Sequence, residues 1–99
     1  MKHRPPEIIG QIEISRNENG IFIGGDPAGL KSLAEQVAWL AEVDQERMPQ
    51  LPDGERVHLH WHPGCQLTRN SEETEISRLD AKGAGLVHGR GSSGENSGG

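Results

Sequence analysis

The clearest hydrophobic pattern in the chain lies between Gly25 and Val43. Apolar residues recur there at three- and four-residue steps, which places them on one face of an amphipathic helix. Asp26 can accept hydrogen bonds from the first free backbone N–H groups, and Pro27 suits the first helical position because it has no N–H to leave unpaired. We expect the helix to end between Val43 and Arg47. The predicted buried stripe consists of Leu30, Leu33, Ala34, Val37, Leu40 and Ala41.

Alternating apolar and polar residues predict strands on both sides of this helix. Residues 8–15 and 21–23 form a predicted hairpin around the turn-forming residues 16–20. Residues 56–62 show the most regular alternation, with Val57, Leu59 and Trp61 on one side and three histidines on the other. Residues 72–79 form a fourth, more polar predicted strand.

The predicted fold is therefore α+β with the order β-β-α-β-β: a four-stranded, largely antiparallel sheet with one helix packed on one face. The other face would meet solvent or a partner. We expect a flexible N-terminal lead-in at 1–6, a single domain at 7–80 and a disordered Gly/Ser-rich tail at 81–99. The predicted core is Ile8, Ile12, Ile14, Ile21, Ile23, Leu30, Leu33, Val37, Leu40, Val57, Leu59 and Trp61, and the predicted open face is Glu13, Phe22, Arg56, His58, His60 and His62.

Composition makes this a thin core, because only 31% of the 99 residues are apolar and 3% are aromatic. Such a core predicts marginal stability or support from self-association, including a homodimer. Cys65 is the only cysteine, which excludes an internal disulfide. With no secretory leader and no apolar run approaching the ~20 residues of a membrane span, we expect a soluble cytoplasmic protein.

The formal net charge is −5, and residues 1–80 hold eight basic against fourteen acidic residues. An acidic body repels phosphate backbones, so we expect no nucleic-acid binding. The same charge suits a partner protein with a basic surface.

Two blocks of the chain resemble the Imm32 family of bacterial immunity proteins. The run 24–34, GGDPAGLKSLA, is similar to that family's G(N/D)xxGLxxLA helix entry. Residues 57–60, Pro63-Gly64 and residues 67–76 are similar to its hydrophobic–His strand, its turn and its LxxxSxELxI closing strand. The resemblance implies a small α+β protein that neutralises a cognate toxin by occupying it, without catalysis, and it carries over no catalytic residue.

The three histidines of residues 56–62 are the strongest candidates for a metal site. His58 and His60 would lie ~6–7 Å apart at Cα on one strand face, near enough to share a metal ion. All three span ~13 Å, too far for one ion without a bend. Cys65 follows a turn and is a conceivable nucleophile beside histidines, but no orienting third group accompanies it. We expect no metal or other cofactor and no enzymatic activity.

The predicted helix also offers a binding surface. Trp39 falls about half a turn from the buried stripe, and the acidic residues on the same outer side are Glu35, Glu42 and Glu46. Tryptophan is enriched at binding hot spots, so this acidic ridge predicts a partner contact. The alternative is that Met48 and Leu51 fold back over Trp39 and the ridge is an ordinary charged face.

The leading hypothesis is thus an immunity protein that contacts its toxin through Glu35, Trp39, Glu42 and Glu46, with Arg56, His58, His60 and His62 as a secondary surface. One alternative is a small metal-binding or accessory domain that uses the histidine strand. The other is a homo-oligomeric structural module that pairs through an exposed strand edge or the open sheet face.

Overall fold

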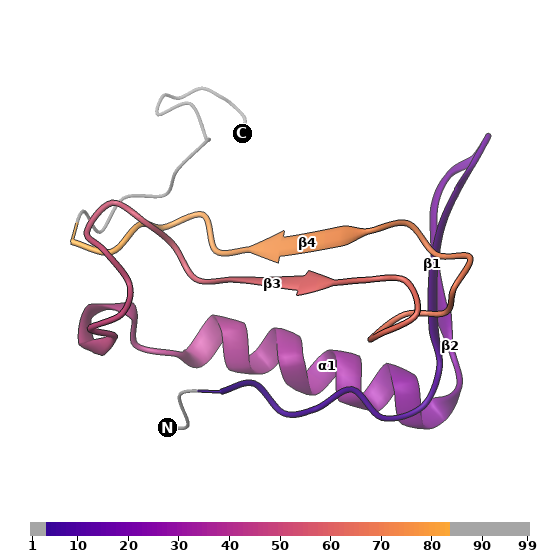
Figure 1. Cartoon of the computed structure of the whole chain (residues 1–99), viewed down its shortest axis with the longest axis horizontal. Helices are drawn as coiled ribbons and strands as arrows, with labels where there is room; N and C mark the ends of the chain where they lie inside the picture. Colours follow the sequence, from indigo (N-terminus) through magenta and orange to yellow (C-terminus); the bar gives the residue numbers. More distant parts are fainter. Residues whose placement is uncertain (1–3, 84–99) are drawn as a thin grey trace. The chain divides into compact units, whose positions relative to one another are not determined.

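The computed structural model describes residues 4–83, which divide into two compact units that are considered separately. The first unit takes in residues 4–43 and 59–76, and the second takes in residues 44–58 and 77–83. The predicted lead-in at 1–6 and the predicted tail at 81–99 therefore lie partly outside the described residues. The elements are β1 (Ile12–Asn17), β2 (Gly20–Gly25), α1 (Pro27–Glu42), the 3-10 helix η1 (Gln45–Arg47), β3 (His58–Trp61) and β4 (Thr74–Ser77) (Figure 1).

The predicted hairpin is confirmed as β1 and β2, which pair antiparallel. Asn17 lies opposite Gly20, so Glu18 and Asn19 make a two-residue turn. The Asn17 side chain accepts a hydrogen bond from the Asn19 N–H at 2.8 Å, and Gly20 has φ of 124°. Local turn chemistry therefore fixes the register of this pair.

The prediction of one four-stranded sheet is wrong, because the strands form two separate two-stranded sheets, β1–β2 and β3–β4. The outer edge of β1 is already bonded by an irregular segment, residues 68–72. Thr68 N–H donates to the Ile12 carbonyl at 2.9 Å, and Glu72 N–H donates to the Ile14 carbonyl at 2.7 Å. Ile14 N–H in turn donates to the Ser71 hydroxyl at 3.1 Å. This segment uses the backbone groups that a third strand would need.

The start of α1 follows the predicted cap. The Asp26 carboxylate accepts from the Gly29 N–H at 2.7 Å and from the Gln11 N–H at 3.0 Å. These backbone hydrogen bonds lower the pKa of Asp26, and the bond from Gln11 has the larger effect. A side chain on Gly29 would place its Cβ 2.1 Å from the Gln11 carbonyl oxygen, so only glycine lets the helix approach this segment. The helix ends at Glu42, one residue before the predicted range.

The first unit has a core formed by β1, β3 and the segments beside them. Its buried members are Ile12, Ile14, Trp61 and Leu67, with Ile8, Leu33, Leu59 and Ile76 packed against them. Leu67 was missing from the predicted core. Four predicted core residues are instead exposed, at 58% for Ile21, 54% for Ile23, 45% for Leu30 and 38% for Val37.

The buried face of α1 shares only Leu40 with the predicted apolar stripe, and Leu33 of that stripe is partly buried against the core. The buried residues of the helix are Gly29, Ser32, Gln36, Trp39 and Leu40. The Ser32 hydroxyl accepts from the Ile9 N–H at 3.0 Å, and Gln36 Nε2 donates to the Pro6 carbonyl at 2.7 Å. Because these polar side chains find partners only on the inner side, hydrogen bonding as well as apolar burial sets which face of the helix turns inward.

The second unit is organised around Gln45, which is buried. Gln45 Oε1 accepts from the Val57 N–H at 2.8 Å, and its Nε2 donates to the Asp80 carbonyl at 3.2 Å. Asp80 also pairs with Arg78 at 2.6 Å, and this hydrogen bond lowers the pKa of Asp80. Lys82 Nζ donates to the Met48 carbonyl at 2.6 Å. Residues 81–83, the described start of the predicted tail, are also held through the backbone, because the Lys82 N–H donates to the Glu55 carbonyl at 2.8 Å.

Candidate functional site

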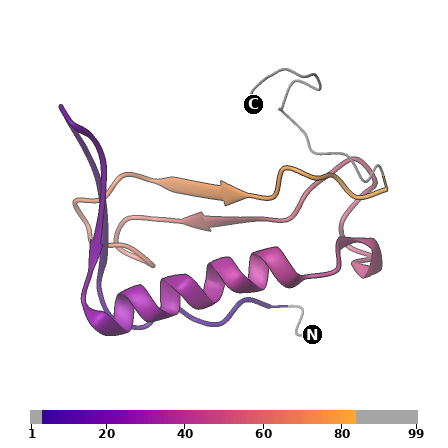
Figure 2. The same ribbon diagram turned by 180° about the vertical axis from the view of Figure 1, so that it is seen from behind.

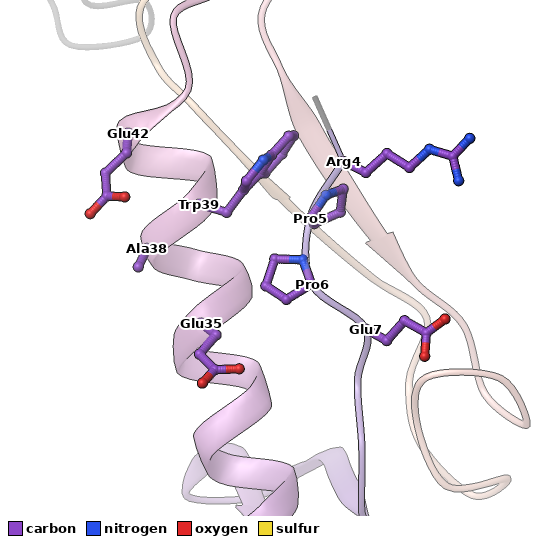
Figure 3. A pocket seen from close by; sticks show the side chains of 8 residues that line it. All are labelled: Arg4, Pro5, Pro6, Glu7, Glu35, Ala38, Trp39 and Glu42. Carbon is purple, nitrogen blue, oxygen red and sulfur yellow. The ribbon is translucent and has the colours of Figure 1, made fainter. Parts of the chain in front are cut away.

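A groove runs between α1 and the N-terminal segment of residues 4–7, with a volume of about 580 Å³ (Figure 3). Its lining residues all belong to the first unit: Arg4, Pro5, Pro6, Glu7, Glu35, Ala38, Trp39 and Glu42. The two sides of the groove are therefore a regular helix and an extended segment, and Figures 1 and 2 both show that segment running beside α1.

Hydrogen bonds hold this segment in place. Gln36 Nε2 donates to the Pro6 carbonyl within the segment, and just beyond it the Ile9 N–H donates to the Ser32 hydroxyl, one helical turn away from Gln36. Gln36 is itself fixed, because its Oε1 accepts from the Trp61 indole N–H at 2.6 Å. Pro5 and Pro6 restrict the intervening backbone to extended conformations. The groove is thus a built feature with a rigid wall on each side.

Trp39 lies at the centre of the groove, and the expectation that it projects outward is wrong. It is only 8% exposed, and its indole is directed toward the N-terminal segment, on the side of Pro5 (Figure 3). Trp39 follows the inward-facing Gln36 by three residues, so the two share a helix face. The indole is therefore a packed part of the groove rather than a free anchor.

Acidic side chains dominate the charge along the groove. Glu35 and Glu42 project from α1, whereas the side chains of Glu7 and of the single basic lining residue, Arg4, extend from the opposite segment on the side away from α1 (Figure 3). An apolar floor of indole and proline rings bordered by carboxylates suits a Lys- or Arg-containing segment that also carries apolar groups. The lining residues thus combine apolar surface with negative charge.

Glu46 does not belong to this groove. The prediction continued helical spacing from Trp39 to Glu46, but α1 ends at Glu42, and Glu46 lies in η1 in the second unit. Its Oε2 accepts from the Gly83 N–H at 2.8 Å. Of the four predicted contact residues, the structure therefore brings together Glu35, Trp39 and Glu42.

The predicted secondary surface is divided between the two units. His60 and His62 stack with ring centroids 5.8 Å apart, and His62 Nδ1 lies 3.2 Å from Glu73 Oε2. Arg56 and His58 belong to the second unit, where His58 Nδ1 lies 3.3 Å from the Arg56 carbonyl.

Within residues 4–83, no group of three His, Cys, Asp or Glu side chains is placed to hold a metal ion. Cys65 is exposed and forms no disulfide. The histidine surface and the absence of a cofactor both stay predictions. In the same residues, no helix is long and apolar enough to span a lipid bilayer.

No family model, curated protein or solved structure matches the chain. The resemblance to the Imm32 family therefore stays a prediction. The case for a binding site rests on the groove itself.

Sequence reasoning missed the second wall of the groove, which is formed by Arg4, Pro5, Pro6 and Glu7. Residues 1–6 were expected to be an extended, mobile lead-in because they are basic and end in two prolines. Two signals pointed to a docked segment. The prolines favour an extended backbone, and the inward positions of the helix include two polar residues, Ser32 and Gln36, that need partners.

Proposed function

We propose that this protein is a non-enzymatic binding protein that acts as an immunity protein, neutralising a cognate bacterial toxin by occupying it. The observation that carries the proposal is the groove, in which Trp39, Pro5 and Pro6 provide apolar surface beside the carboxylates of Glu7, Glu35 and Glu42. The resemblance to the Imm32 family points to the same class of function. The proposed setting is the cytoplasm, where an immunity protein would meet its toxin.

The proposed partner segment is basic and partly apolar. Carboxylates around an apolar floor steer cationic groups toward the groove and penalise acidic competitors. The net charge of −5 strengthens this preference at long range. Binding through the groove would block the toxin by covering its surface, so no residue of this chain needs to react.

The test is protection of growth. The reading frame immediately upstream is expected to encode a large secreted toxin, and its C-terminal domain would be expressed in a bacterial host with and without this protein. We expect growth to cease with the toxin domain alone and to recover with the wild-type protein. The proposal is overturned if the folded protein gives no protection against that domain.

Two matched variants connect protection to the groove. Glu35→Lys/Glu42→Lys reverses the groove carboxylates on α1, whereas Glu18→Lys/Glu75→Lys changes the net charge equally at exposed positions away from the groove. We expect the first variant to lose protection and the second to keep it. Equal loss in both would assign the effect to overall charge.

A further inference from the structure

The outer edge of β2 presents backbone groups that have no partner among residues 4–83. Asn17 and Gly20 close the two-residue turn as a hydrogen-bonded pair. Along β2, every second residue from Gly20 onward bonds to β1, so Ile21 and Ile23 do not. The N–H and C=O groups of these two residues therefore point away from β1. The same alternation explains why Ile12 and Ile14 of β1 bond outward to residues 68–72.

Nothing among the described residues covers this edge. No described residue bonds to the outward backbone groups of Ile21 or Ile23, and the sheet ends at β2. Ile21, Phe22 and Ile23 are 58%, 48% and 54% exposed. The strand contains no charged residue and no proline, which are the residues that would discourage pairing with another strand. Such an edge is a template for another strand.

The sequence of the β2 edge reads the same in both directions. Residues 20–24 read Gly-Ile-Phe-Ile-Gly, a palindrome centred on Phe22, the only phenylalanine in the chain. An antiparallel copy centred on Phe22 would place each isoleucine opposite an isoleucine and each glycine opposite a glycine. The outward groups also match, because Ile21 and Ile23 meet as hydrogen-bonded pairs while Phe22 occupies the non-hydrogen-bonded position between them.

We infer that β2 is a homodimer interface, in which two copies of this chain pair antiparallel about a twofold axis at Phe22. Each Ile21 exchanges both backbone hydrogen bonds with Ile23 of the second copy, and the two hairpins become one four-stranded sheet. The two Phe22 rings lie directly opposite each other on one face, where non-hydrogen-bonded partners approach most closely. On the other face, the paired isoleucines cover one another.

Charge and shape favour a second copy over an unrelated strand. Two molecules of net charge −5 repel each other, but the paired residues carry no charge, so like charges are absent from the contact itself. Leu30 extends the apolar face, because its side chain lies over Gly25, on the side of β2 that carries Ile21 and Ile23. The pairing is short, so the dimer is weak and forms between about 10 µM and 1 mM.

The test is sedimentation equilibrium of the full chain over this concentration range, with variants at the proposed axis. Phe22→Lys and Phe22→Glu each place two like charges directly opposite one another, whereas Ile9→Lys puts a charge at another exposed apolar position of the same unit. We expect the wild-type protein and Ile9→Lys to dimerise and both Phe22 variants to stay monomeric. Below about 10 µM, where the wild type is also monomeric, the melting temperatures of all four proteins should be similar. Mixing the two Phe22 variants should restore a dimer, because their substituted side chains attract across the axis.

Three results would overturn the proposal: a wild-type protein that is monomeric up to 1 mM, a dimer that persists in the Phe22 variants, or a mixture of the variants that stays monomeric. Salt gives an independent readout. The dimer should strengthen as salt screens the repulsion between acidic copies, whereas toxin binding through the groove should weaken. The dimer and the proposed function use different residues, so either can fail while the other stands.

Discussion

Gln36 connects three parts of the first unit through one buried amide. Its oxygen accepts from the Trp61 indole at 2.6 Å, and its nitrogen donates to the Pro6 carbonyl at 2.7 Å. The bond to Trp61 is buried and the bond to Pro6 is partly buried, so solvent cannot easily replace the lost partner of the Trp61 indole N–H. The side chain therefore supports the core and the groove wall at once.

Replacing this amide should expose its role in a double-mutant cycle. Gln36→Leu leaves the Trp61 N–H buried without an acceptor, so we expect a loss of about 1–3 kcal/mol in the free energy of unfolding. In a Trp61→Phe background the same substitution should cost about 1 kcal/mol less, since no indole N–H remains to be orphaned. Urea denaturation of the four proteins measures both values. An equal cost in the two backgrounds would mean that this hydrogen bond contributes nothing specific.

Asp26 predicts a pH dependence of stability. Its pKa is lowered in the folded protein, so the folded state is stabilised fully above the unfolded pKa of about 3.9 and loses that stabilisation as the pH falls through the lower folded value. Asp26→Asn keeps an oxygen acceptor at the cap but does not titrate. The melting temperature of the wild type should therefore exceed that of the variant near neutral pH, and the gap should close below about pH 4. A gap independent of pH would contradict the prediction.

At the scale of elements, local signals were sufficient for the hairpin and for the existence of the helix. The turn residues between β1 and β2, the Asp26 cap and the three- to four-residue periodicity all act within one element. The orientation of α1 was not predictable in this way. Ser32 and Gln36 are polar, so a prediction from apolar periodicity places them on the solvent side. In the structure Ser32 bonds to the N-terminal segment and Gln36 bonds to Trp61.

Paired substitutions test the observed orientation of α1. Trp39 is 8% exposed and Val37 is 38% exposed. Trp39→Ala should therefore lower the free energy of unfolding by about 3–5 kcal/mol. Val37→Ala should cost less than about 1 kcal/mol, because it removes half-exposed surface and alanine favours a helix. Thermal and urea unfolding report both. Comparable costs, or a larger cost at Val37, would restore the orientation predicted from periodicity.

Sheet formation failed as a prediction because it depends on contacts between distant residues. The predicted number of strands was correct. The sequence cannot show, however, that residues 68–72 occupy the outer edge of β1, where a third strand would have paired. The consequence extends to β2. Within residues 4–83, no third strand pairs with β2, so the apolar edge at Ile21 and Ile23 stays open there.

At the scale of the molecule, the protein combines an acidic groove with an uncharged strand edge. Three of the residues predicted from periodicity to form an outward ridge, Glu35, Trp39 and Glu42, line the groove, although Trp39 is packed rather than outward-facing. The remainder required knowing that an N-terminal segment lies against the helix, and that the helix stops before Glu46. Both surfaces belong to the first unit, so each can be altered while the second unit is left intact.

The most direct test of the central claim is a calorimetric titration of the purified toxin domain with this protein at low and high salt. We expect binding that weakens as salt rises, that falls at least tenfold in Glu35→Lys/Glu42→Lys, and that changes little in the charge-matched Glu18→Lys/Glu75→Lys. Unfolding curves establish that all three proteins are folded. Binding that ignores salt, or that both variants weaken equally, would contradict the groove as the toxin-binding surface.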